Sequence, residues 1–283
     1  MSKVDQFESV FRSATKAVYH LSTPVVGKVL VVTDLGKQEA ERFVAADREF
    51  LAVLADVEWA VVTGDQYGNI ADLLGLVERH RPDLVVTYRH LQSDAWKWPF
   101  SLGEHLDVLT QAAGSPVFVL PHPTAGGAME HALVNTDVVM AVTDHLTGDD
   151  ELVNWSVRFT APGGVLWLTH IENERNFEHF MTVVGKIPSI DTDHARETVL
   201  AQLLKEPADY IDSCKTVLEA SELSIDVQPM VQVGHRLEEY KRLIDEHKVD
   251  MLVMSTKDEY QAAMHGLAYP LAVELREIPL LLL

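Results

Sequence analysis

Residues 233–258, VGHRLEEYKRLIDEHKVDMLVMSTKD, read as a turn, an amphipathic helix and a buried strand. Leu237, Tyr240 and Ile244 recur at helical spacing, and charged residues fill the opposite face of the helix. Residues 249–254 are then nearly all apolar, as in a strand that is covered on both faces of a parallel sheet. Ligands of open α/β sheets bind at the carboxyl ends of the strands. The stretch therefore predicts an α/β fold with a candidate site just after this strand.

A weaker copy of this unit lies in the first half of the chain, at residues 70–87, IADLLGLVERHRPDLVVT. In both copies a helical pattern ends in His, a basic residue, any residue and Asp, and an apolar run follows. These four residues are 80–83 in the first copy and 247–250 in the second. Two such units indicate an internal duplication. A chance similarity between two helix–strand pieces is the alternative.

The composition restricts the classes of function. The chain of 283 residues is 47% apolar and 23% charged, with a formal net charge of −20. Such a charge repels phosphate backbones and anionic lipids, so we expect no nucleic-acid and no membrane partner. We find no secretory signal and no segment long enough to span a bilayer, which favours a cytoplasmic protein. The single cysteine, Cys214, lies among apolar residues and reads as a buried hydrophobe rather than a nucleophile.

Apolar, β-rich runs alternate with helical patterns along the chain. We expect strands at residues 28–33, 57–63, 83–87, 115–120, 137–143, 165–170, 225–233, 249–254 and 278–283. This alternation predicts parallel sheets built from right-handed βαβ units. The expected fold class is α/β, with two tandem open parallel-sheet α/β sandwich domains.

A segment with two prolines and two glycines separates the halves and marks the domain boundary. We expect an N-terminal helical extension at residues 1–24, a first domain of four strands at 25–121, a linker at 122–134 and a second domain of five strands at 135–283.

Two segments of the second half depart from the regular alternation. Residues 171–190 read as a polar, irregular insertion with little periodicity. The helical pattern of residues 193–221 contains Pro207, so we expect the helix to break or kink there.

Short motifs recur in the same order in both halves. Asp34 and Asp144 each follow the first strand of a half. Gly103 and Gly266 each lie 13 positions before the proline of the last strand. Together with the unit at residues 234–254, these motifs resemble the universal stress protein family in its tandem two-domain form.

The resemblance covers almost the whole chain after Pro24. It implies the fold named above, shared with adenine-nucleotide alpha-hydrolase-like proteins, and a role in stress response. It also implies that the two domains pair as an intramolecular pseudo-dimer through their last strands, residues 116–120 and 279–283. A further homodimer is compatible with it.

Nucleotide-binding members of that family carry a loop, G-x2-G-x9-G-(S/T), whose glycines let backbone N–H groups approach the phosphates closely. In this chain Tyr88 and Leu91 stand at the first two glycine positions of the first half, and Ser255 and Asp258 at those of the second. In the second half Leu267 also replaces the hydroxyl residue. Because these side chains block the backbone approach, we expect the usual ATP site to be lost in both halves.

The degenerate site leaves five candidate binding residues, which are Asp34, Asp144, Ser255, Thr256 and Gly266. The resemblance implies that the two aspartates take positions that contact adenosine in nucleotide-binding members. Capping of a following helix is the alternative role for the aspartates and for the two hydroxyl residues.

Other clusters carry weaker signals. His170, Glu172, Glu178 and His179 gather around the insertion, but their spacing fits no standard metal pattern, and a solvated loop is the preferred reading. No nucleophile elbow, P-loop or dinucleotide motif occurs. The tryptophans at positions 96 and 98 either contact a partner or ligand or cover a sheet edge.

The sequence thus predicts a non-enzymatic universal-stress-type protein that binds a protein partner or small ligand, with no cofactor and no metal. The alternative is a member of the family that still binds ATP or another nucleotide, or hydrolyses ATP slowly. A metal-dependent enzyme that uses His170 and His179, the histidines around the insertion at residues 171–190, is a third, weaker alternative.

Overall fold

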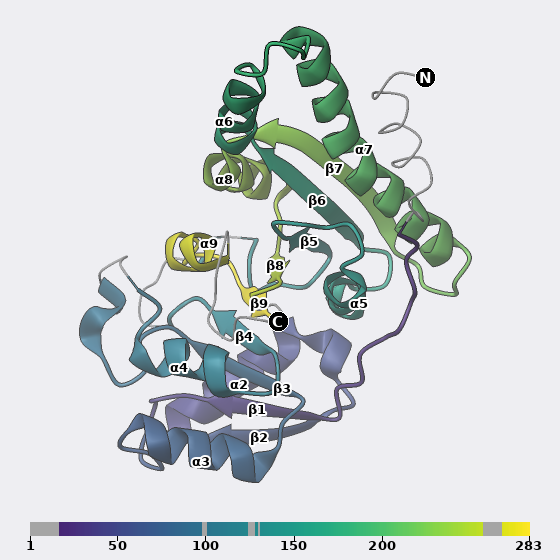
Figure 1. The fold of residues 1–283 in the computed structure, drawn as a ribbon. Coiled ribbons are helices and arrows are strands. Elements are labelled where there is room, and N and C mark those ends of the chain that lie inside the picture. Colours follow the sequence, from purple (N-terminus) through teal and green to yellow (C-terminus); the bar gives the residue numbers. More distant parts are fainter. Residues whose placement is uncertain (1–16, 98–100, 124–127, 130, 257–267) are drawn as a thin grey trace.

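The computed structural model describes residues 17–97, 101–123, 128–129, 131–256 and 268–283 of the chain. In this part the strands form one twisted sheet with helices packed on both faces (Figure 1). The α/β fold class predicted from the sequence is confirmed. The expected extension, linker and domain boundaries stay predictions, since the sheet is continuous across them.

The strands follow the apolar runs of the sequence. They are β1 (Lys28–Val32), β2 (Glu58–Val62), β3 (Leu84–Tyr88), β4 (Val117–Leu120), β5 (Val138–Val142), β6 (Val165–Asn173), β7 (Asp226–Gly234), β8 (Met251–Met254) and β9 (Leu280–Leu282).

The helices lie between them. They are α2 (Lys37–Phe50), α3 (Ile70–His80), α4 (Glu104–Ala112), α5 (Asp150–Phe159), α6 (Glu174–Val184), α7 (Thr192–Glu219), α8 (Arg236–His247) and α9 (Ala268–Glu274), with short 3-10 turns η1 (Ala52–Leu54) and η2 (Asp94–Lys97).

The strand order across the sheet is β2-β1-β3-β4-β9-β8-β5-β6-β7. All neighbouring strands are parallel except β4 and β9, which pair antiparallel with Phe118 opposite Leu281. The first strand of each half, β1 or β5, therefore lies inside its half of the sheet. The end of the chain lies at the centre of the molecule, where β9 joins the two halves.

Successive side chains of the strands enter two different cores, because they point to opposite faces of the sheet. Val29 and Val31 of β1 pack with α2, α5 and α7 on one face. Leu30 and Val32 pack with α3, α4, α8 and α9 on the other. Both cores contain residues of both halves. The sheet is therefore covered on both faces, which explains why its strands are nearly continuous apolar runs.

Residues 171–190 are not the irregular insertion that the sequence predicts. β6 continues to Asn173, whose side chain accepts a hydrogen bond from the Asn176 backbone and so caps α6. Phe177 and Met181 of α6 are buried one turn apart. Exposed apolar residues such as Phe180 lie on the other face of this helix, so the apolar positions form no single stripe in the sequence.

Of the break or kink expected at Pro207, the break is wrong. α7 continues through Pro207 to Glu219. The proline removes one backbone hydrogen bond of the helix. It is itself buried, and Tyr210, Ile211 and Cys214 of the next turns are buried in the core against the sheet. This packing offsets the local cost of the proline.

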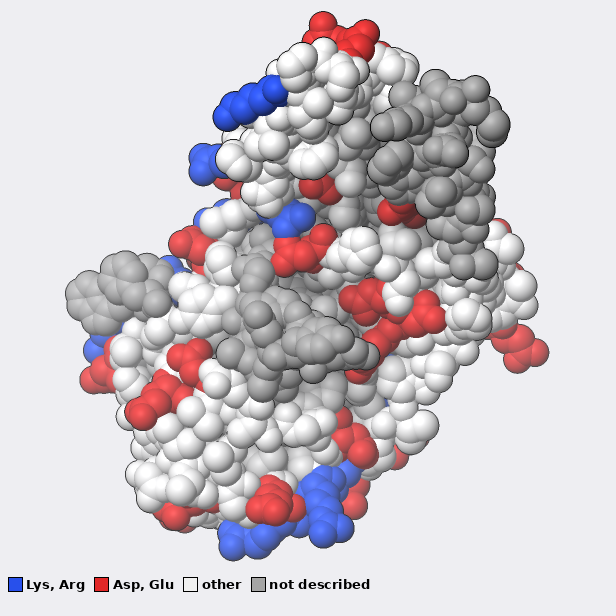
Figure 2. Space-filling view, in the orientation of Figure 1, with Lys and Arg blue, Asp and Glu red and all other residues white. Residues whose placement is uncertain are grey.

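Residues 17–27 form neither helix nor strand, and the rest of the helix expected near the start lies outside the described residues. The Tyr19 backbone N–H donates to Ser213 Oγ of α7 at 3.0 Å. From there the chain runs across the molecule to β1 (Figure 1). Acidic side chains are spread over both halves on the face drawn in Figure 2. Among the described helices, none is long and apolar enough to cross a membrane.

Candidate functional site

Two strand ends meet at the candidate site of the first half. Asp34 follows β1 and Tyr88 ends β3, the strand beside it. One carboxylate oxygen of Asp34 accepts a hydrogen bond from the Tyr88 hydroxyl, and the other accepts from the Gln92 backbone N–H at 2.7 Å. The Tyr88 hydroxyl also lies 2.7 Å from Thr33 Oγ1 and accepts from the Asp34 N–H at 3.2 Å. Both carboxylate oxygens of Asp34 are thus bound within the chain.

The Tyr88 side chain fills the space between these strand ends. It is fully buried, and its ring packs edge-on against Phe43 of α2 and His122, with ring centroids 5.4 Å and 5.0 Å away. Burial, and next the hydrogen bond to Asp34, raise the pKa of Tyr88 well above its ordinary value. The hydroxyl therefore stays protonated and remains a donor to the carboxylate.

The loop after β3 holds this arrangement without glycine. His90 and Gln92 have φ angles of 61° and 58°, in the left-handed region that favours glycine. The Gln92 side chain donates to the Gly64 carbonyl oxygen at 3.1 Å. Gly64 itself must be glycine, because a Cβ there would lie 2.3 Å from the Asp34 carbonyl oxygen. Gly103 has a φ of 93° and lies against His90, which fixes the start of α4.

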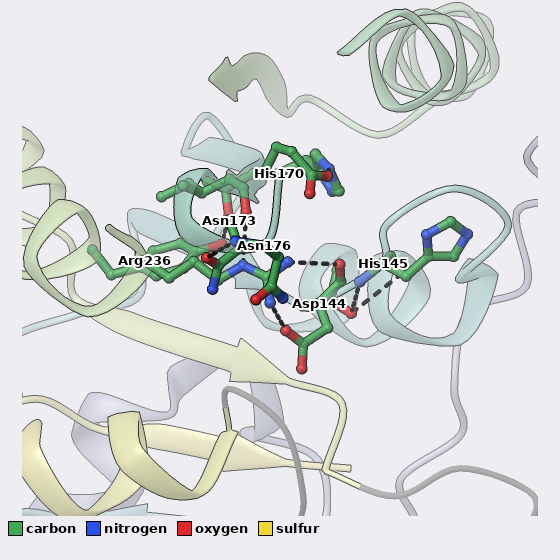
Figure 3. A network of polar contacts seen from close by, with 11 residues as sticks. Asp144, His145, His170, Asn173, Asn176 and Arg236 are labelled. Carbon is green, nitrogen blue, oxygen red and sulfur yellow. Dashed lines mark hydrogen bonds and ion pairs between the residues drawn. The ribbon is translucent and has the colours of Figure 1, made fainter. Parts of the chain in front are cut away.

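The site of the second half is closed by an ion pair instead. Asp144 follows β5, and its carboxylate binds the guanidinium of Arg236, the first residue of α8 (Figure 3). Arg236 Nε also donates to the Ile171 carbonyl oxygen of β6 at 2.8 Å. Arg236 is only 17% exposed and Asp144 39%. Asp144, the second-half aspartate expected beside adenosine, is therefore paired with a cation of the same chain.

Ser255 and Thr256, the two candidate residues with hydroxyl groups, both form hydrogen bonds within the chain. Ser255 Oγ donates to Asp149 Oδ2 at 2.8 Å, and Asp149 caps α5 by accepting from the Leu152 N–H at 3.0 Å. Burial raises the pKa of Asp149. Thr256 donates from its hydroxyl and its N–H to the Leu283 carbonyl oxygen. Ser255 thus ties β8 to α5, and Thr256 ties it to the end of β9.

Several candidates are not placed by the structure. Gly266 and Asp258 lie outside the described residues, as do Trp98 and the side chain of Trp96. The structure therefore brings Ser255 and Thr256 to the end of β8 but gives no position for the glycine that would complete a phosphate loop.

A polar cluster surrounds the Asp144–Arg236 pair. His145 follows Asp144, and His170 of β6 is buried with its Nε2 3.5 Å from Glu172. Burial lowers the pKa of His170, and Glu172 opposes this. No group of three or more His, Cys, Asp or Glu side chains within the described residues has a geometry that could hold a metal ion.

The sequence analysis missed two of the residues that matter most here. In the sequence Tyr88 stands out only as a replacement for glycine, because its hydrogen bond to a residue 54 positions earlier leaves no local signal. Arg236 does carry a signal in the sequence, since it lies just beyond β7, at the sheet edge where Asp144 also lies.

No protein-family model matches the sequence, and a comparison with curated proteins also gives no match. Solved structures with a similar fold include a universal stress protein from Archaeoglobus fulgidus, 12% identical, which aligns over 91% of this chain and 98% of its own with a TM-score of 0.49. Another is a protein of unknown function from Pseudomonas aeruginosa, 11% identical, aligned over 92% of this chain and 93% of its own with a TM-score of 0.49. At this identity the likeness is one of fold alone.

The α/β fold that the resemblance implies is confirmed by the sheet and its covering helices, and membership of the universal stress protein family stays a prediction. In both halves the acidic side chain at the end of the first strand has its charge satisfied by groups of the same chain.

Proposed function

We propose that this chain is a non-catalytic, universal-stress-type binding protein that does not hold ATP at the usual strand-end positions. The observation that carries the proposal is the binding of both Asp34 carboxylate oxygens by Tyr88 and Gln92. For a nucleotide to use Asp34, it would have to displace a buried tyrosine. Leaving a buried hydroxyl or carboxylate unpaired costs about 1–3 kcal/mol for each group.

The second half supports the same proposal. A nucleotide that needed Asp144 would have to break its pair with Arg236, which is itself mostly buried. Removing one partner from such a pair leaves a charge uncompensated. The formal net charge of −20 also disfavours a polyphosphate ligand unless a local cationic site overcomes it.

In the cell we expect this protein to act in the cytoplasm in a stress response, by binding a protein partner or a small ligand. The two halves act as one intramolecular pseudo-dimer, and a homodimer of the whole chain is compatible with this role. The pairing of β4 with β9 supports the first of these expectations.

The test is to measure nucleotide content and ATP affinity of the purified protein. We expect no excess absorbance near 260 nm after denaturation, no heat of ATP binding at millimolar ATP, and no phosphate release. Micromolar ATP binding that is abolished by Asp144→Ala or Asp34→Ala would overturn the proposal and favour the nucleotide-binding alternative. Glu49→Gln, an exposed change on α2 away from both strand ends, is the matched control.

A further inference from the structure

A carboxylate lies in the buried stripe of α2. Ala40, Asp47 and Phe50 are the buried residues of this helix, and Phe43 lies between them on the same face. Their spacing of three and four residues is that of a helix face packed on a core. Asp47 therefore takes a position where an apolar residue is the norm.

Within the described part of the chain, no charged group offsets the burial of the Asp47 carboxyl. The residue is only 5% exposed, and its Oδ2 accepts no hydrogen bond from the described residues. The nearest cation in sequence, Arg48, points elsewhere and lies 5.9 Å from the ring centroid of Trp59. Burying an ionised carboxylate without a partner costs the folded state several kcal/mol. Such a residue therefore calls for a role that its burial alone does not explain.

The carboxylate borders a cavity of about 390 Å³ between α2 and the segment after β4. Its lining also includes Phe43, Phe50, Leu120, Pro121 and His122. The walls are thus mostly apolar, with Asp47 and His122 as the titratable groups among the lining residues. The exposed lining residues are Ala46, Pro123, Ala128 and Leu133, so the cavity opens to solvent among them. Asp34 and Tyr88 are not among the lining residues, but the Tyr88 ring packs on Phe43 and His122, so this cavity adjoins the strand-end site.

The size and chemistry of the cavity restrict what it accepts. A dry cavity of about 150 Å³ holds one benzene ring, so this space admits a ring with a short polar chain. Burial raises the pKa of Asp47 to about 8 and lowers that of His122. A neutral imidazole does not repel a cation, and a bound cation favours the ionised carboxyl. An anionic ligand would gain nothing from either group.

We propose that this cavity binds a small amine with an apolar body, its ammonium group paired with Asp47 and its body against Phe43, Phe50 and Leu120. The pairing gives the buried carboxylate the charge-assisted hydrogen bond that the chain itself does not supply. The proposal goes beyond the loss of ATP binding and does not depend on it, because neither Asp34 nor Asp144 lines the cavity.

Three probes of one size separate the contributions of charge and apolar contact. They are 2-phenylethylamine, its neutral counterpart 2-phenylethanol and the anion phenylacetate, titrated into the full chain and followed by ligand-observed NMR. We expect the amine to bind best and phenylacetate worst. Asp47→Asn should weaken amine binding at least about tenfold, as expected for loss of one charge-assisted contact, and leave the alcohol unchanged.

Two further variants keep the test decisive. Glu49→Gln removes the same charge from the exposed face of α2, so it corrects for general attraction of cations to this acidic protein. Ala46→Trp narrows the mouth and should weaken the amine and the alcohol alike. Equal amine binding by wild type and Asp47→Asn would overturn the proposal, as would equal affinity for all three probes or no binding at about 10 mM amine. Binding of ATP by the protein would overturn the proposed loss of the nucleotide site but not the proposed amine site.

Discussion

Two aspartates at equivalent positions of the two halves accept hydrogen bonds from the backbone of a neighbouring strand. Asp83 Oδ2 accepts from the Gly27 and Lys28 N–H groups at 2.8 and 2.9 Å, and Asp250 Oδ2 accepts from the Val138 N–H at 2.8 Å. Each therefore ties the start of one strand to the start of its neighbour. The recurring His-basic-x-Asp pattern is explained by this bond and by the helix end that precedes it.

The basic residue of that pattern also has a defined role. Arg81 and Lys248 end α3 and α8 with φ angles of 47° and 52°, and each N–H donates back to the preceding turn. This is the left-handed helix cap that glycine usually supplies. The same non-glycine cap in both halves favours duplication over a chance similarity.

Asp47 should make the stability of the protein depend on pH. Its pKa in the folded state is about 8, above the value of about 3.9 for an unfolded chain. The folded state therefore binds this proton more tightly, and the contribution of Asp47 to the stability falls as the pH rises from about 4 to 8. Asp47→Asn should be neutral below pH 4 and should stabilise by about 2–5 kcal/mol above pH 8. Urea unfolding at several pH values measures this.

The control for Asp47 is Glu49→Gln, which should leave the pH dependence of unfolding unchanged because Glu49 is exposed. A stability gain for Asp47→Asn that is the same at pH 4 and pH 8.5 would show that the carboxyl does not titrate with a raised pKa.

Tyr88→Phe should destabilise the first half through lost hydrogen bonds alone. The hydroxyl contacts Thr33 and both the carboxylate and the N–H of Asp34, and these groups are largely shielded from water. We expect a loss of about 1–3 kcal/mol in the free energy of unfolding. Tyr269→Phe, at a residue that is 38% exposed, should change little. Equal unfolding free energies for the two variants would mean that water readily replaces the Tyr88 contacts.

At the scale of elements, local patterns predicted most of the fold because burial on both faces gives each strand a clear apolar run. The strands at residues 138–142 and 251–254 are examples. α6 was missed because it is amphipathic over a short length and carries apolar residues on its exposed face. The Asp34–Tyr88 contact could not be predicted in detail, since it depends on how two parallel strands align at their ends.

α6 offers a test of which side chains hold a helix in place. Met181 is 2% exposed, whereas Phe180, its neighbour in the same helix, is 51% exposed. Met181→Ala should destabilise by about 2–4 kcal/mol through the cavity it leaves, and Phe180→Ala by less than about 0.5 kcal/mol. Chemical unfolding gives both values, and hydrogen exchange should show the loss of protection in α6 first. If Phe180→Ala destabilised the protein more than Met181→Ala, the face of α6 that carries Phe180 would be the one packed on the core.

Across the whole molecule, the two halves share their cores as well as their sheet. Phe118 of β4 stacks on Phe159 of α5 with ring centroids 5.6 Å apart. The buried Arg89 of the first half donates to the Ala272 and Leu275 carbonyl oxygens at the end of α9. The first described residues are bound to the second half as well, through Tyr19. The halves are therefore expected to unfold together.

Leu281→Ala tests this coupling at the centre of the sheet. Leu281 is fully buried in β9, opposite Phe118 of β4 and beside Val253 of β8. Its truncation leaves a cavity in a core that contains residues of both halves, so we expect a loss of about 2–5 kcal/mol. The unfolding transition should stay single, and hydrogen exchange should speed up in β1 and β3 as well as in β5 and β8. Leu223→Ala, at a residue 41% exposed, is the control and should be neutral. Independent halves would instead give two unfolding transitions. β1 and β3 would then stay as protected from exchange as in the wild type, because the Leu281→Ala change would not destabilise the first half.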